Sequence, residues 1–122
     1  MNGPIRIVFV EDDPEMMAIY VENFMTPEFE IMTATNGKNA IEVLRNSKTE
    51  FNVIVTDNCM PQMDGLKLLR LVRQEFPKIK LLMITAYGDW TDYVDAHNIG
   101  VQKFVDKPVK MSELRNLIRA IA

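Results

Sequence analysis

Five short apolar runs alternate with five helical patterns along this chain. The runs are typical of strands buried in a sheet, and the segments between them place apolar residues at helical spacing. This order predicts a parallel sheet covered on both sides by helices and joined by right-handed crossovers. The strands are expected at residues 5–10, 30–35, 53–57, 80–84 and 102–105, and the helices at 14–25, 37–47, 65–76, 90–99 and in the segment that ends the chain.

The composition fits one globular domain, which we assign to residues 1–122, since 48% of the 122 residues are hydrophobic. A net charge of -3 gives no electrostatic footprint for direct nucleic-acid binding. The single cysteine, Cys59, cannot form an internal disulfide, and no apolar run is long enough to cross a bilayer. A cytoplasmic protein with no membrane partner is therefore expected.

The first helix carries both a start signal and an apolar surplus. Asp13 before Pro14 predicts an N-cap, which leaves the neighbouring acids Glu11 and Asp12 unexplained by capping. Crowded acids repel one another, and a bound cation would offset that cost. The residues expected to face the sheet are Met16, Ile19, Tyr20 and Phe24. The remaining apolar residues, Met17, Val21 and Met25, either dock a partner or cover neighbouring loops.

Polar residues follow four of the predicted strands. In a parallel sheet these strand ends share one edge, where ligands bind in open α/β folds. Asp57 ends the third strand, although an acid at that position also fits a simple loop cap. The residues gathered at this edge are Glu11, Asp12, Asp57, Thr85 and Lys107. Three carboxylates suit Mg²⁺, and a hydroxyl and an ammonium suit phosphoryl oxygens, so the set predicts phosphoryl transfer to Asp57.

Four motifs in this order resemble the receiver domain of two-component response regulators. They are V-E-D-D-P, V-T-D-N-C-M-P-Q-M-D-G, I-T-A-Y-G and F-V-D-K-P, and together they span most of the chain. The resemblance implies a flavodoxin-like fold with strand order 2-1-3-4-5. It also implies a cytoplasmic signalling protein rather than an enzyme, apart from its own phosphorylation and dephosphorylation.

The resemblance assigns roles to individual residues. Asp57 is similar to the phosphoacceptor, and Glu11 and Asp12 to the acidic pair that binds Mg²⁺ with the backbone carbonyl of Cys59. Thr85 resembles the switch hydroxyl and Lys107 the lysine that pairs with the phosphoryl group. Two further matches are Phe104, at the position of a switch aromatic that is often Tyr, and the bond from Lys107 to Pro108, which is usually cis in this family.

Some positions keep two interpretations. Cys59 either tunes the lifetime of the phosphorylated state or contributes only its carbonyl, and Tyr87 either shields the acyl phosphate or is a plain loop aromatic. Trp90, Tyr93 and His97 share one side of the fourth helical pattern, away from Val94 and Ala96. They form either an exposed output surface or a half-buried contact with adjoining elements.

The expected partners are a histidine kinase or a histidine phosphotransfer protein, a downstream output protein or domain, and in the phosphorylated state a second copy of the chain.

Two other classes of protein compete with this functional prediction. A phosphohydrolase of the haloacid dehalogenase type needs an acid two residues after its nucleophile, where this chain has Cys59. An interaction module that works without phosphorylation is the second. The chain ends directly after its last helix, so we expect either a complete single-domain regulator or part of a longer one.

Overall fold

The computed structural model describes residues 3–58, 64–86 and 90–122, and it contains one five-stranded parallel sheet. The strand order is β2-β1-β3-β4-β5, as predicted. The second strand begins and ends one residue earlier than predicted, and the fifth one residue later. The elements are β1 (Ile5–Val10), α1 (Pro14–Phe24), β2 (Phe29–Ala34), α2 (Gly37–Asn46), β3 (Val53–Asp57), α3 (Gly65–Glu75), β4 (Lys80–Thr85), α4 (Trp90–Ile99), β5 (Lys103–Asp106) and α5 (Met111–Ile121).

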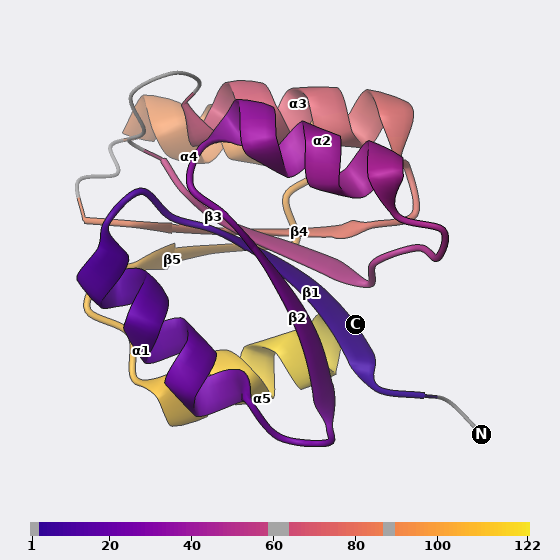
Figure 1. Ribbon diagram of the computed structural model, residues 1–122. Coiled ribbons are helices and arrows are strands. Elements are labelled where there is room, and N and C mark those ends of the chain that lie inside the picture. The colour runs from indigo at the N-terminus through magenta and orange to yellow at the C-terminus, as the bar shows by residue number, and fades with distance from the viewer. Residues whose placement is uncertain (1–2, 59–63, 87–89) are drawn as a thin grey trace.

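Helices cover both faces of the sheet and create two apolar cores. Figure 1 shows α1 and α5 on one face and α2, α3 and α4 on the other. The core beneath α1 and α5 includes Phe9, Phe24 and Leu114, whereas the opposite core includes Val8 and Leu69. The sheet is therefore the middle of three layers, as the uninterrupted apolar strands predict.

Side chains alternate between these two cores along each strand, and this alternation decides where the strand-end residues point. Val53 and Val55 lie in the core beneath α1 and α5, and Asp57 continues that alternation two residues later. Val105 belongs to the same core and Lys107 follows it by two residues. The two residues therefore approach each other on the α1/α5 side of the sheet edge.

Local signals define several helix ends. The Asp13 carboxylate accepts a hydrogen bond of 3.0 Å from the Glu15 backbone N–H, which confirms the predicted cap. Asp64 caps α3 in the same way, through a 2.8 Å bond from the Lys67 N–H. Gly100 ends α4 with φ +94°, a conformation that L side chains rarely adopt.

The inward face of α1 is shifted around the helix relative to the prediction, because Met17, which was expected to point elsewhere, packs against the core together with Met16. Tyr20 and Phe24 are buried, and both rings pack against Phe9 at centroid distances of 4.7 and 4.9 Å. The prediction that Ile19 faces the sheet is wrong, because its side chain is 42% exposed. Residues 16, 20 and 24 follow a strict four-residue spacing, and position 19 lies beyond the edge of that stripe.

No helix in the described part of the chain is both long and apolar enough to cross a membrane.

Candidate functional site

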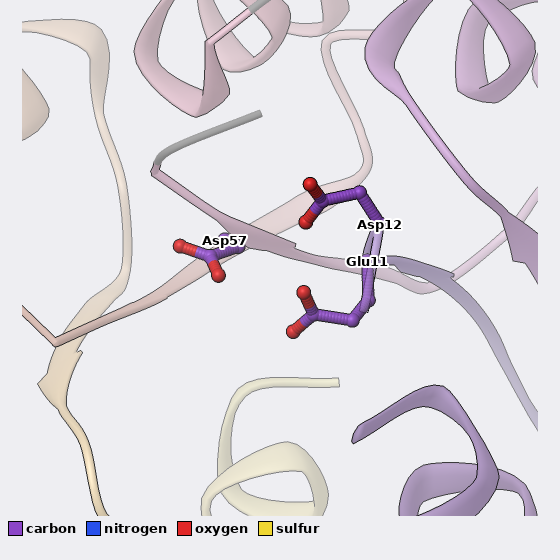
Figure 2. Close-up of side chains that lie close together, drawn as sticks. All are labelled: Glu11, Asp12 and Asp57. Atoms are coloured by element: carbon purple, nitrogen blue, oxygen red, sulfur yellow. The ribbon is translucent and has the colours of Figure 1, made fainter. Parts of the chain in front are cut away.

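Three carboxylates converge where β1 and β3 end. Oxygen atoms of Glu11, Asp12 and Asp57 all lie within 4.8 Å of one another. Figure 2 shows the Glu11 and Asp12 side chains extending from the end of β1 toward the side on which Asp57 lies. Glu11 is buried, Asp57 is half-buried and Asp12 is exposed, so the cluster runs from the protein interior to solvent.

Lys107 supplies an ammonium group to this cluster. Its Nζ donates a hydrogen bond of 2.8 Å to Asp57 Oδ2 and lies 3.6 Å from Glu11 Oε1. The backbone N–H of Lys107 also donates to the Thr85 carbonyl at 2.8 Å, which fixes the segment after β5 against the end of β4. The sequence-predicted acids and lysine therefore form one site.

The electrostatics of this site are unbalanced. Burial raises the pKa of Glu11 above its usual range, the charge of Lys107 opposes that rise, and the charge of Asp57 adds to it. Burial lowers the pKa of Lys107, but its hydrogen bond to Asp57 and the nearby carboxylates outweigh burial, and the net pKa is raised. The Lys107 ammonium thus pairs with two of the three clustered carboxylates, those of Glu11 and Asp57.

A divalent cation fits this imbalance. Glu11 Oε1 is the one buried side-chain oxygen or nitrogen, among the described residues, without a hydrogen-bond partner. The nearest cationic group, Lys107 Nζ, lies 3.6 Å from this oxygen. A buried acceptor without a hydrogen bond is costly, and it is a natural ligand for a hard cation such as Mg²⁺. The oxygen chemistry of the three acids and their separation are therefore compatible with Mg²⁺.

Thr85 reaches the same edge from the neighbouring strand. Asp57 pairs in register with Ile84, so Thr85 lies one residue beyond the partner of the central acid. Thr85 is 1% exposed and pairs with Asp106 of β5. Thr85 is therefore a buried residue at the strand end next to the one that carries Asp57.

Gly65 is a site residue that sequence reasoning did not single out. Its backbone N–H donates to the Asn58 carbonyl at 2.8 Å, and a Cβ at this position would overlap the backbone oxygen of Asp57. The first turn of α3 can therefore approach the end of β3 only because residue 65 lacks a side chain. A glycine next to the Asp64 cap was the available signal.

Two sequence predictions concern residues 59 and 87, Cys59 and Tyr87, which lie outside the described residues. The bond from Lys107 to Pro108 is cis, as the resemblance implied.

The aromatic stripe predicted on α4 divides into two environments. Trp90 is 80% exposed and His97 is also exposed, whereas Tyr93 is half-buried against Phe104. On the side of the helix away from this stripe, Val94 is 38% exposed and Ala96 is the only buried residue of α4. The helix contacts the molecule through a narrow face, so its remaining sides are open.

Comparisons with known proteins identify the family to which this fold and this acidic site belong. The model of the response regulator receiver domain matches residues 7–119, and this chain belongs to that family. The two-component response regulators ORR26 of Oryza sativa subsp. japonica and ARR10 of Arabidopsis thaliana are each 30% identical to it over 113 residues. These alignments cover 93% of this chain but 19% and 20% of the relatives, so the chain spans about a fifth of their length.

A solved structure agrees with the observed architecture. The CheY-like response regulator receiver domain protein from Methanospirillum hungatei JF-1 superposes with a TM-score of 0.90 at 25% identity, covering 96% of this chain and 92% of that one. The flavodoxin-like fold is confirmed. Receiver domains are signalling switches rather than classical enzymes, and response regulators interact with histidine kinases and with output domains.

Proposed function

We propose that Asp57 accepts a phosphoryl group from a phosphohistidine of a histidine kinase or histidine phosphotransfer protein. The observation that carries this proposal is the joining of Asp57 to Lys107 beside Glu11 and Asp12 at one sheet edge. Such a site supplies a nucleophile, a fixed cation and a cluster of hard oxygen ligands. Residues 1–122 act in this proposal as one cytoplasmic receiver domain that binds neither nucleic acid nor membrane directly.

The transfer forms one bond and breaks one. A carboxylate oxygen of Asp57 attacks the phosphorus in line with the donor nitrogen, and an O–P bond forms as the N–P bond breaks. The imidazole nitrogen leaves with the electron pair and the histidine returns to its neutral form after taking up a proton. Lys107 lies 2.8 Å from Asp57 Oδ2 and can follow the charge onto the phosphoryl oxygens.

Glu11, Asp12 and Asp57 are the side chains that would hold Mg²⁺, with the Cys59 carbonyl as a further ligand expected from the family resemblance. The ion supplies charge neutralisation for the phosphoryl oxygens. Glu11 Oε1, which is buried without a hydrogen-bond partner, is the observation that supports this assignment.

The donor protein is proposed to approach along α1. A shallow groove there is lined by Glu11, Asp12, Met17, Val21 and Met25, so apolar side chains continue from the acids. A phosphohistidine protein must approach Asp57 past this groove, and flexible methionine side chains adapt well to the surface of a partner. This favours docking for the apolar surplus of α1, with Met25 72% exposed.

We expect phosphorylation of Asp57 to change the surface formed by α4, β5 and α5. The Thr85 hydroxyl is expected to bond the new phosphoryl oxygens while Phe104 turns inward, which remodels the surface of α4, β5 and α5. Trp90, Tyr93 and His97 are the proposed contacts for an output protein or domain, or for a second phosphorylated copy.

Intact-mass measurement after incubation with Mg²⁺ and acetyl phosphate tests the central step. One phosphoryl adduct is expected on the wild type, and none is expected on Asp57→Asn or in excess chelator. Asp95→Asn is the matched control, since it removes a carboxylate on α4, and it should label fully.

Persistent stoichiometric labelling of Asp57→Asn would contradict the assignment of the phosphoacceptor. Absence of any adduct on a folded, Mg²⁺-binding wild type would favour a module that works without phosphorylation. Sustained hydrolysis of generic phosphate esters would favour the phosphohydrolase.

A further inference from the structure

Tyr93 makes two contacts from α4 to β5. Its hydroxyl group donates a hydrogen bond of 2.8 Å to Asp106 Oδ2, and its ring centroid lies 4.2 Å from the centroid of Phe104. Phe104 has no hydroxyl of its own, so the polar tether between this helix and this strand comes from Tyr93. One side chain thus holds both the proposed switch aromatic and the residue two positions beyond it.

The two partners of Tyr93 lie on one face of β5. Phe104 packs against the core beneath α2 and α3, whereas Val105 belongs to the opposite core. Because strand side chains alternate, Asp106 returns to the side of Phe104 and Lys107 to the side of Asp57. The Tyr93 contacts and the acidic cluster therefore lie on opposite faces of the same short strand end.

Asp106 is coupled to the site through the backbone. It is the register partner of Thr85, and the next peptide N–H, that of Lys107, donates to the Thr85 carbonyl at 2.8 Å. In the proposed function Thr85 and Lys107 are the two groups that move to meet a phosphoryl group. Their displacement changes the position of Asp106 relative to α4.

The attachment of α4 is uneven along its length. At its C-terminal end Arg73 donates hydrogen bonds to the carbonyls of Gly100 at 2.9 Å and Ile99 at 3.4 Å. Ahead of that end the helix buries only Ala96. Tyr93 thus provides a polar attachment between the first half of α4 and β5.

We propose that the hydrogen bond from Tyr93 to Asp106 is a latch that holds α4 and Phe104 in the arrangement of the unphosphorylated protein. The latch rests on the proposed function, because it opposes the change that phosphorylation of Asp57 induces. Breaking it lets the first half of α4 move about the end fixed by Arg73. Asp106 also raises the pKa of Tyr93, so the hydroxyl remains a protonated donor at neutral pH.

The latch has a measurable thermodynamic consequence. A contact that stabilises one conformer shifts the equilibrium away from the other conformer. It lowers the affinity of every ligand that binds the other conformer by the factor by which that equilibrium shifts. A hydrogen bond of ordinary net strength corresponds to about a fivefold change in affinity. Removing it should therefore strengthen the binding of an acyl-phosphate mimic, although no residue that touches the mimic has changed.

The experiment is a calorimetric titration of the Mg²⁺-loaded protein with beryllofluoride, a mimic of the phosphoryl group on a carboxylate. Tyr93→Phe keeps the ring on Phe104 and removes the hydroxyl, and it should bind about fivefold tighter. Asp106→Asn tests the acceptor, and the double variant should gain no more than the tighter single variant. Asp95→Asn, also on α4, controls for the loss of a negative charge, and its affinity should stay near that of the wild type.

Trp90 gives a second readout. It is the single tryptophan and sits 80% exposed at the start of α4, so its fluorescence reports on this half of the helix. In Tyr93→Phe without beryllofluoride, the emission should shift toward that of the beryllofluoride-bound wild type.

Unchanged or weaker affinity of Tyr93→Phe, with normal binding to the wild type, would overturn the latch and leave the proposed function standing. If Asp106→Asn and Asp95→Asn gained affinity for beryllofluoride equally and Tyr93→Phe gained none, the loss of a negative charge would explain the effect. That result would also overturn the latch. Failure of the wild type to bind beryllofluoride in the presence of Mg²⁺ would instead count against the proposed function, and the latch would fall with it.

Discussion

Charged groups are organised differently at the sheet edge and on the outer surface of the helices. On the surface, Arg45 meets Glu75 through two hydrogen bonds of 2.7 Å, and Arg119 meets Glu28 through a similar pair. Each guanidinium has one carboxylate partner, and the four side chains are 40–60% exposed. These pairs are electrically matched and surrounded by water.

At the sheet edge the carboxylates outnumber the cationic side chain that pairs with them, and Glu11 and Asp57 are more buried than the surface pairs. Glu11 and Asp57 share Lys107 while Asp12 lies beside them, and the Glu11 side chain is only 1% exposed. A sequence selected only for stability would avoid a buried carboxylate oxygen that has no hydrogen-bond partner. Incomplete pairing at the sheet edge therefore indicates a place where a ligand supplies the missing charge, whereas complete pairing on the surface indicates a structural role alone.

Lys107→Met should give the largest change in stability, because it removes the ammonium that pairs with the buried carboxylate of Glu11 and the half-buried carboxylate of Asp57. We expect a loss of about 2 kcal/mol without Mg²⁺, less than for a fully buried pair because the Lys107 side chain is 26% exposed. Added Mg²⁺ should recover part of this loss by replacing the ammonium charge. Urea unfolding with and without Mg²⁺ measures both effects.

The matched control is Lys103→Met, the same substitution at an exposed position of β5. It should change stability little and should not alter the response to Mg²⁺. Equal losses in the two variants would show that the ammonium at the site does no more than a surface charge.

Asp12→Asn should separate stability from ligand binding. Asp12 is exposed and adds repulsion to Glu11, so without Mg²⁺ the variant should be as stable as the wild type or up to about 1 kcal/mol more stable. The wild type should gain about 1.4 kcal/mol for each tenfold rise in Mg²⁺ above the dissociation constant, and the variant should gain far less in the same range. The measurement is the urea midpoint as a function of Mg²⁺ concentration.

Asp13→Asn serves as the control, since asparagine caps a helix as well as aspartate and removes a neighbouring charge. It should retain most of the Mg²⁺ response. If both variants lost that response equally, general charge rather than ligation by Asp12 would explain it.

The parts of this molecule that were predictable from sequence depend on local patterns. Unbroken apolar runs and the caps at Asp13 and Gly100 placed the strands and helices within a residue or two, and parallel topology then brought Asp57 and Lys107 to one edge.

Features that depend on neighbouring elements were not predictable. Ile19 was expected to face inward, but which side of a helix is covered depends on what packs beside it. The overlap that a side chain at Gly65 would cause, and the bond from Tyr93 to Asp106, depend on distances between segments far apart in the sequence. No periodicity in a single sequence reports such distances.

The smallest effects should come from breaking the matched surface pairs with Glu75→Gln and Glu28→Gln. Hydrogen bonds from Arg45 and Arg119 lower the pKa values of these two carboxyls in the folded protein. Their contribution is therefore present above the unfolded-state pKa, about 4.3, and is lost as the pH falls through the lower folded-state pKa. Each variant should be slightly less stable than the wild type at neutral pH, with the gap closing in acid and shrinking in high salt. Thermal midpoints measured across pH and salt concentration test this prediction. A loss of stability as large as that of Lys107→Met would show that matched surface pairs and the incompletely paired site do not differ in this respect.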